Sequence, residues 1–133
     1  FMVSHEGVQL APFYDLLSVA SYDSPAFDKV AWPAATQLAW PILDVHRFSD
    51  ITRELMLEVG AVLNLARGTA ERLLSHLQGR IVQEAEALYT EVEAENAHIA
   101  HVRPALSATL AGEALCLRTI QHTVIKEMVS RLV

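Results

Sequence analysis

The sequence predicts a mainly α-helical fold: a helical bundle of about three main helices with a small N-terminal β-hairpin. Apolar residues recur at helical spacing through most of the chain after residue 49, and a short apolar segment with a glycine turn opens the chain. Prolines and tryptophans are concentrated between these two regions. At 133 residues the chain can bury one continuous core, so we expect a single domain over residues 1–133.

The hairpin is expected from two short apolar runs, at residues 1–4 and 8–11. Gly7 between them can adopt a positive φ and so allows a tight turn. Prolines then interrupt any helical period between residues 12 and 48. We therefore predict packed loops there, with a short strand near residues 36–40.

Three helices are predicted in residues 49–133. Ser49 is expected to cap the first helix, whose apolar positions recur every three or four residues. The second should begin near Thr69, and Gly79 could bend or break it. Pro104 is tolerated in a first helical turn, so the third helix is expected to begin there and run almost to the end of the chain.

Composition limits the classes of function. The net charge of −6 repels a phosphate backbone, so direct binding to nucleic acid is not expected. No apolar run approaches the roughly 18 to 20 residues that span a bilayer, so a membrane protein is not expected either. A single cysteine and the lack of a secretion signal at the N-terminus predict a cytoplasmic location.

Residues 10–18, with the sequence LAPFYDLLS, resemble the segment of HipA-type serine/threonine kinase toxins that carries their Mg²⁺-binding aspartate. The resemblance continues through residues 37–41 and 46–52 and, as a helical pattern, through most of the remaining chain. It implies that Asp15 is a metal ligand and that Tyr14 lines the nucleotide-binding cleft. It also implies that the fold is part of a kinase-like C-lobe, and that residues 1–133 are a C-terminal fragment of such a kinase.

The resemblance further implies that the general base and the other catalytic-loop residues lie upstream of Phe1, so no catalytic residue is expected within this chain. The intact parent would use Mg²⁺ and ATP to phosphorylate a protein substrate, and the fragment alone should be inactive. As a toxin of a toxin–antitoxin system, the parent would have a DNA-binding antitoxin of the HipB type as its partner. The family carries glycines after its middle apolar segment, where Leu43 and Asp44 stand here.

The residues alone leave alternatives open. Asp15 could cap the following turn through its side chain, because local hydrogen bonding by aspartate is common. Tyr14 could be a core aromatic residue whose hydroxyl has a hydrogen-bond partner. The alternative function is a stand-alone helical protein-interaction or oligomerisation module without catalysis, forming a homodimer through an exposed apolar face.

Two further groups of residues could form a metal site or a site for a protein partner. Glu95, His98 and His101 have the spacing to share one helix face, where a metal could bind, but a solvated helix end is the better interpretation. Trp32 and Trp40, each followed by proline, could be exposed anchors for a partner. We expect both instead to pack the irregular region onto the helices.

Overall fold

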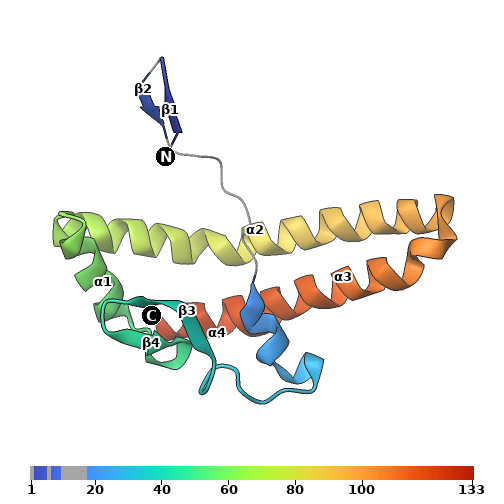
Figure 1. Ribbon diagram of the computed structural model, residues 1–133, viewed down its shortest axis with the longest axis horizontal. Coiled ribbons are helices and arrows are strands. Elements are labelled where there is room, and N and C mark those ends of the chain that lie inside the picture. The colour runs from blue at the N-terminus through green and yellow to red at the C-terminus, as the bar shows by residue number, and fades with distance from the viewer. Residues whose placement is uncertain (1, 6, 10–17) are drawn as a thin grey trace.

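The structure, a computed structural model, describes residues 2–5, 7–9 and 18–133 (Figure 1). Two long helical segments lie side by side and antiparallel, and a short helix crosses between them at one end. The first long segment is α2 (Arg67–Val102), and the short helix is α1 (Arg53–Val62). The second comprises α3 (Ser107–Thr119), a π-helical turn (Ile120–Ile125) and α4 (Lys126–Arg131). The predicted mainly helical fold with a small N-terminal hairpin is confirmed.

Within the described residues, four strands form two separate antiparallel hairpins. In the first, β1 (Met2–Ser4) pairs with β2 (Gly7–Gln9), and Gly7 has the expected positive φ, 114°. In the second, β3 (Gln37–Ile42) pairs with β4 (Val45–Arg47). The strand predicted near residues 36–40 is therefore present, whereas sequence reasoning missed β4.

The segment before β3 folds into short 3₁₀ turns rather than regular helix, at Val19–Asp23 and Pro25–Phe27. Ser21 and Ser24 are fully buried here. Each hydroxyl donates a hydrogen bond to a carbonyl three residues earlier, at 2.8 Å and 2.6 Å respectively. Because their polar groups are satisfied locally, these small side chains can be enclosed without an unpaired donor.

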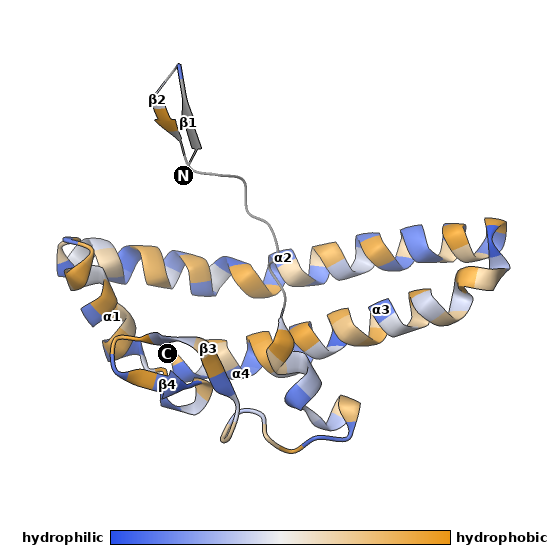
Figure 2. Cartoon of the chain, in the orientation of Figure 1, coloured by the Kyte–Doolittle hydropathy of each residue, from blue (hydrophilic) through white to orange (hydrophobic). Residues whose placement is uncertain are grey.

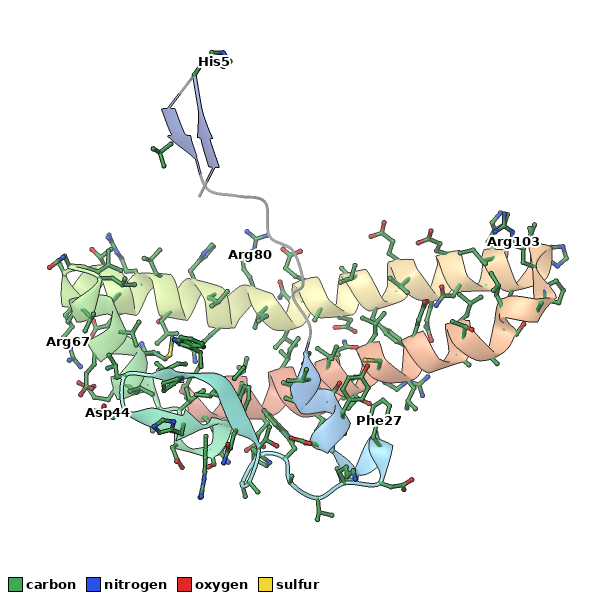
Figure 3. All side chains as sticks on the ribbon, in the orientation of Figure 1. His5, Phe27, Asp44, Arg67, Arg80 and Arg103 are labelled. Carbon is green, nitrogen blue, oxygen red and sulfur yellow. The ribbon has the colours of Figure 1, made fainter. Side chains whose placement is uncertain are left out.

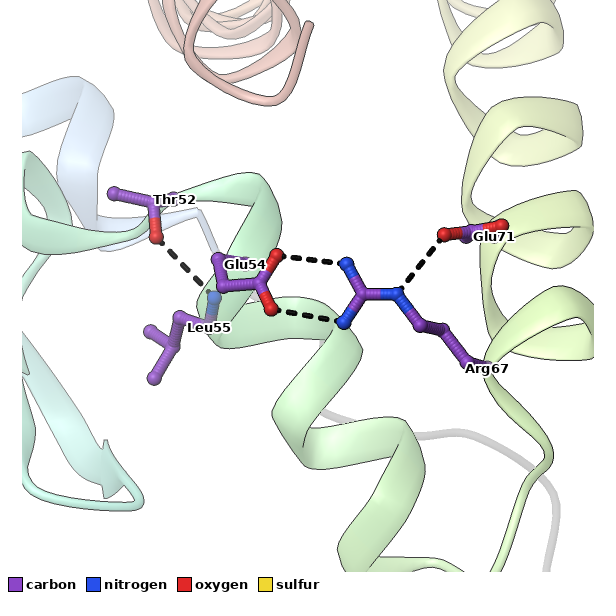
Figure 4. Close-up of polar contacts among 5 residues, drawn as sticks. All are labelled: Thr52, Glu54, Leu55, Arg67 and Glu71. Atoms are coloured by element: carbon purple, nitrogen blue, oxygen red, sulfur yellow. Dashed lines mark hydrogen bonds and ion pairs between the residues drawn. The ribbon is translucent and has the colours of Figure 1, made fainter.

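The capping residue of α1 differs from the prediction. The Thr52 hydroxyl accepts a hydrogen bond from the backbone N–H of Leu55 at 3.2 Å (Figure 4). Ser49 lies in a 3₁₀ turn (Phe48–Asp50), and its hydroxyl donates to the Asp50 carboxylate at 2.9 Å. The prediction of Ser49 as the cap was wrong because this extra turn delays the start of the helix to Arg53.

The end of α1 is a Schellman motif that turns the chain into α2. The backbone N–H of Leu65 donates to the Gly60 carbonyl, and that of Asn64 donates to the Ala61 carbonyl, both at 2.9 Å. Asn64 has a φ of 59°, in the left-handed region that asparagine tolerates better than most residues. The motif ends α1 and directs the chain back along it.

The long helix α2 passes through Gly79 without a break. An ion pair between Arg80 and Glu84, one turn apart, supports the exposed side of the helix just after this glycine. After α2, a 3₁₀ turn (Pro104–Leu106) leads into α3, so the predicted role of Pro104 at the start of the third helix is confirmed. No helix among the described residues has the length and apolar character needed to cross a bilayer.

The core is divided into two apolar clusters. Both long helical segments, α2 and the one that runs from α3 to α4, carry apolar residues along their length, which Figure 2 shows in orange. One cluster packs the segment before β3 against the π-helical turn and α4. It consists of Ala20, Trp32 and Val124, with Phe48 and Met128 packed against them. The other cluster lies between α1 and α2, and the C-terminal Leu132 reaches it. It consists of Leu57, Ala70 and Leu74, with Met56 and Leu132 packed against them.

Two arginines fix the C-terminal end of the chain to the rest. Arg53 donates to the Gln78 side-chain oxygen at 3.0 Å and to the Leu132 carbonyl at 3.2 Å. Arg131 donates to the Ser49 carbonyl at 3.0 Å. These hydrogen bonds connect α1, α2 and the C-terminal end of α4, so they hold the three segments together around the second cluster.

Candidate functional site

The two residues predicted to bind metal and nucleotide, Asp15 and Tyr14, lie outside the described residues. Downstream of them, the Ser18 carbonyl accepts hydrogen bonds from both the backbone N–H and the hydroxyl of Ser21. The assignment of Asp15 and Tyr14 therefore stays a prediction.

An apolar groove between α1 and α2 is one of the concave sites of the described residues. It has a volume of about 210 Å³. Its lining is entirely apolar: Met56, Val59, Gly60, Leu63, Leu65, Ala70, Leu73, Leu74 and Leu77. We call this site the α1–α2 groove.

The floor of the α1–α2 groove is buried, and its rims are exposed. Ala70 and Leu74 are buried at the base. Leu63, Leu73 and Leu77 have 65%, 55% and 57% of their surface exposed. Large apolar side chains gathered in this way around a concave site are typical of a surface that binds another molecule.

The geometry of the groove depends on a close approach of the two helices. A Cβ atom at Gly60 would lie 2.7 Å from the Cβ of Ala70, closer than two such atoms can come. Glycine at this position therefore allows α1 to lie against the first turns of α2.

An ion-pair network crosses the same helix junction (Figure 4). Arg67, at the start of α2, donates to both carboxylate oxygens of Glu54 on α1, at 2.9 and 3.0 Å. It also donates to Glu71 at 3.2 Å. The hydrogen bond and the positive charge of Arg67 lower the pKa of the Glu54 carboxyl below its ordinary value. The network links α1 to the first turn of α2, and because all three side chains are well exposed, it adds little stability.

A second concavity continues the α1–α2 groove along α2. It has a volume of about 290 Å³ and shares Leu77 with the groove. Its other lining residues are His76, Arg80, Ile81 and Glu84. The apolar surface thus ends at a charged rim, an arrangement common in interfaces between proteins.

The two tryptophans have opposite environments. Trp32 is 8% exposed and packs against Phe48 with ring centroids 5.1 Å apart, so its predicted packing role is confirmed. Trp40 lies in β3 and is 84% exposed. The prediction that Trp40 packs onto the helices was wrong, because its side chain projects from the solvated face of a two-stranded hairpin.

The structure does not bring Glu95, His98 and His101 together as a metal site. Glu95 and His98 line a cavity between α2 and α3, but His101 is not part of its lining. Among residues 2–5, 7–9 and 18–133, no three histidine, cysteine or acidic side chains are placed to hold a metal ion together.

Comparisons with known proteins identify no relative. No family model matches the chain, and neither a curated protein nor a solved structure matches it.

Sequence reasoning did not find the α1–α2 groove. Three of its leucines lie on the predicted second helix, where Leu74 is buried but Leu73 and Leu77 are exposed. The signal was present in the adjacent pair Leu73-Leu74, because neighbouring residues on a helix point about 100° apart and cannot both face the same partner closely. The network of Glu54 and Arg67 had no such signal, because these residues belong to different helices.

Proposed function

We propose that this chain is the C-terminal helical part of a HipA-type protein serine/threonine kinase, the toxin of a toxin–antitoxin system. The observation that carries the proposal is the LAPFYDLLS segment at residues 10–18, with Asp15 at the position of the family's Mg²⁺-binding aspartate. The mainly helical fold of the residues that follow supports the proposal.

The turn between β3 and β4 departs from the family's pattern in sequence. Leu43 is the first of two residues between β3 and β4, and its φ is 52°, in the left-handed region that glycine adopts most readily. The family carries glycines after the corresponding apolar segment. Leu43 and Asp44 stand in place of these glycines, so the turn itself does not carry the resemblance.

Under this proposal, the Asp15 carboxylate binds Mg²⁺ and Tyr14 lines the nucleotide cleft of the parent kinase. The metal neutralises charge on the ATP phosphates when it is bound. The general base and the remaining phosphate-binding groups of such a kinase would lie outside residues 1–133. Residues 1–133 alone therefore transfer no phosphoryl group, and the parent acts in the cytoplasm on a protein substrate, with a HipB-type DNA-binding antitoxin as its partner.

Isothermal titration of residues 1–133 with Mg²⁺-ATP tests the assignment of Asp15. We expect weak, saturable binding that requires Mg²⁺ and is lost in Asp15→Asn. Asp28→Asn is the matched control, because Asp28 has a φ of 56°, which asparagine also adopts, and the substitution removes the same charge. Equal binding by wild type and Asp15→Asn would contradict the assignment.

A second candidate function is a helical protein-interaction or oligomerisation module without catalysis. The α1–α2 groove favours it, because its rims expose three leucines beside an apolar floor. A second copy of the chain could cover this surface in a two-fold symmetric dimer.

Sedimentation equilibrium tests this second candidate. We expect a concentration-dependent dimer that Leu73→Gln and Leu77→Gln together dissociate. Leu88→Gln is the control: Leu88 is 53% exposed on α2 but lies outside the groove lining. A monomer at all concentrations, or equal weakening by the control substitution, would exclude dimerisation through the groove.

A further inference from the structure

A cavity of about 610 Å³ lies between α2 and α3, next to the turn that joins them. We call it the α2–α3 cavity. It lies at the end of the molecule where Arg103 is labelled in Figure 3, and Figures 1 and 3 show no other described element beside this end. Apolar side chains from both helices and the turn form most of its walls: Val92, Ile99, Val102, Leu106 and Leu110. Because only two helices meet here, the apolar surface between them stays open on one side.

The apolar walls of the α2–α3 cavity are partly exposed. Leu110, at its floor, is buried, but Val102 has 61% and Leu106 has 37% of its surface exposed. Large apolar side chains exposed around a concave site are typical of a surface that packs against another molecule. A second pair of helices across the open side would complete a four-helix bundle, in which the apolar faces of all four helices are covered.

Opposite charges line the α2–α3 cavity at two separate levels. Glu95 is about two turns before the end of α2, and Glu113 is nearly two turns after the start of α3, so both carboxylates lie at one level of the antiparallel pair. Arg103 lies at the turn itself, roughly 10 Å further along the helices. All three side chains are exposed, and within the described part of the chain they form no ion pair or hydrogen bond. These charges are therefore available to a partner.

This charge pattern is complementary to itself under a two-fold rotation. A two-fold axis perpendicular to the helices at the level of Ile99, midway between the two charged levels, brings Arg103 of each copy to the acidic level of the other. An arrangement with both turns at the same end would instead place like charges together, which is unfavourable. Charge complementarity therefore selects a second copy of this chain, with the two turns pointing in opposite directions.

We propose that two copies of this chain associate through the α2–α3 cavity as an antiparallel pair of helical hairpins. Arg103 of each copy lies beside Glu95 and Glu113 of the other, and Ile99 and Val102 of the two copies cover each other between these charges. The interface is short, so the dimer is weak. The surface is separate from the α1–α2 groove, and the proposal is independent of both functions proposed above.

Sedimentation equilibrium with exchanged charges tests this proposal. The starting protein is residues 1–133 with Leu73→Gln and Leu77→Gln, which remove any association through the α1–α2 groove, and we expect it to form a concentration-dependent dimer. Adding Glu95→Arg with Glu113→Arg makes both charged levels basic, whereas adding Arg103→Glu makes both acidic. Each charge variant alone should dimerise about tenfold more weakly or worse, because like charges then face each other at both levels. An equimolar mixture of the two variants should associate about as tightly as the starting protein, because every contact again joins opposite charges.

The charged and apolar contacts each have a matched control. Glu58→Arg with Glu86→Arg makes the same change of charge at exposed positions outside the cavity lining and should leave the dimer unchanged. Val102→Gln should weaken the dimer because it places a polar group in the interface. Val62→Gln, at a position on α1 that is 66% exposed, should not weaken it. Circular dichroism verifies the fold of every variant.

Three results would overturn the proposal. The first is a starting protein that stays monomeric at millimolar concentration. The second is a dimer that the two charge variants form as tightly as the starting protein. The third is a mixture of the two charge variants that associates no more tightly than either variant alone.

Discussion

Gly60 on α1 and Ala70 on α2 approach so closely that a Cβ atom on Gly60 would lie 2.7 Å from the Cβ of Ala70. This contact sets the distance between the two helices at the floor of the α1–α2 groove. The obstructing atom is attached directly to a helix backbone, so it cannot move aside as the end of a flexible side chain can. One of the helices must shift to admit any larger residue at Gly60.

Gly60→Ala is therefore expected to lower the free energy of unfolding by about 1–3 kcal/mol, the usual cost of overpacking. The gain in helix propensity of up to about 1 kcal/mol offsets only part of this. Gly79→Ala in α2 is the control, since its Cβ would meet nothing within 4 Å. Gly79→Ala should stabilise the protein slightly, and urea denaturation measures both changes. Stabilisation of equal size in the two variants would contradict the close packing at Gly60.

The two tryptophans should respond differently to substitution. Trp32→Ala removes a buried ring from the first core cluster and should cost about 3–5 kcal/mol of stability. Trp40→Ala, on the exposed face of β3, should change stability by no more than about 0.5 kcal/mol. Thermal unfolding measures both variants. In the single-tryptophan variants Trp32→Phe and Trp40→Phe, acrylamide should quench the remaining Trp40 far more than the remaining Trp32.

The ion pair of Glu54 with Arg67 should make stability depend on pH. The pKa of Glu54 is lowered in the folded state, so its stabilising contribution is present above the ordinary carboxyl pKa of 4.5. It is lost as the pH falls through the lowered pKa. Glu54→Gln should therefore be less stable than wild type at neutral pH, and the difference should vanish in strong acid.

High salt should reduce the same difference, because the pair is exposed and screened. Glu58→Gln serves as the control, because Glu58 is exposed on the same helix and its side chain forms no ion pair or hydrogen bond among the described residues; it should change stability little. A Glu54→Gln deficit that persisted unchanged into strong acid would show that the pair is not its source.

The turn between β3 and β4 offers a stabilising substitution. Leu43 has a φ of 52°, which costs a non-glycine residue about 1 kcal/mol or more. Leu43→Gly should raise the melting temperature, because the exposed leucine side chain adds little packing. Asp44→Gly, at the neighbouring position where φ is not positive, should not stabilise. A lower melting temperature for Leu43→Gly than for Asp44→Gly would contradict strain at Leu43.

Sequence periodicity predicted the helices well because apolar spacing directly reflects which residues a helix buries. It did not predict the cap, since Ser49 and Thr52 are both good capping residues and only the 3₁₀ turn at Phe48–Asp50 decides between them. It could not assign Trp32 and Trp40 to opposite environments, because both precede a proline in the same irregular region.

The candidate sites were less predictable than the fold. The α1–α2 groove depends on the contact of Gly60 with Ala70, and the α2–α3 cavity depends on how two distant segments meet. Neither relation is local in sequence. The role of Asp15 is inferred from the resemblance of residues 10–18 to a family. Asp15 lies outside the described residues, so the structure does not bear on this inference.

Phosphoryl transfer from ATP to a protein substrate, measured on a full-length protein that contains residues 1–133, tests the proposal of a kinase most directly. The account predicts Mg²⁺-dependent phosphorylation of serine or threonine that falls to background in Asp15→Asn, because a metal-binding carboxylate is lost. The Asp28→Asn control should retain activity. Absence of phosphoryl transfer, or full activity in Asp15→Asn, would contradict the account.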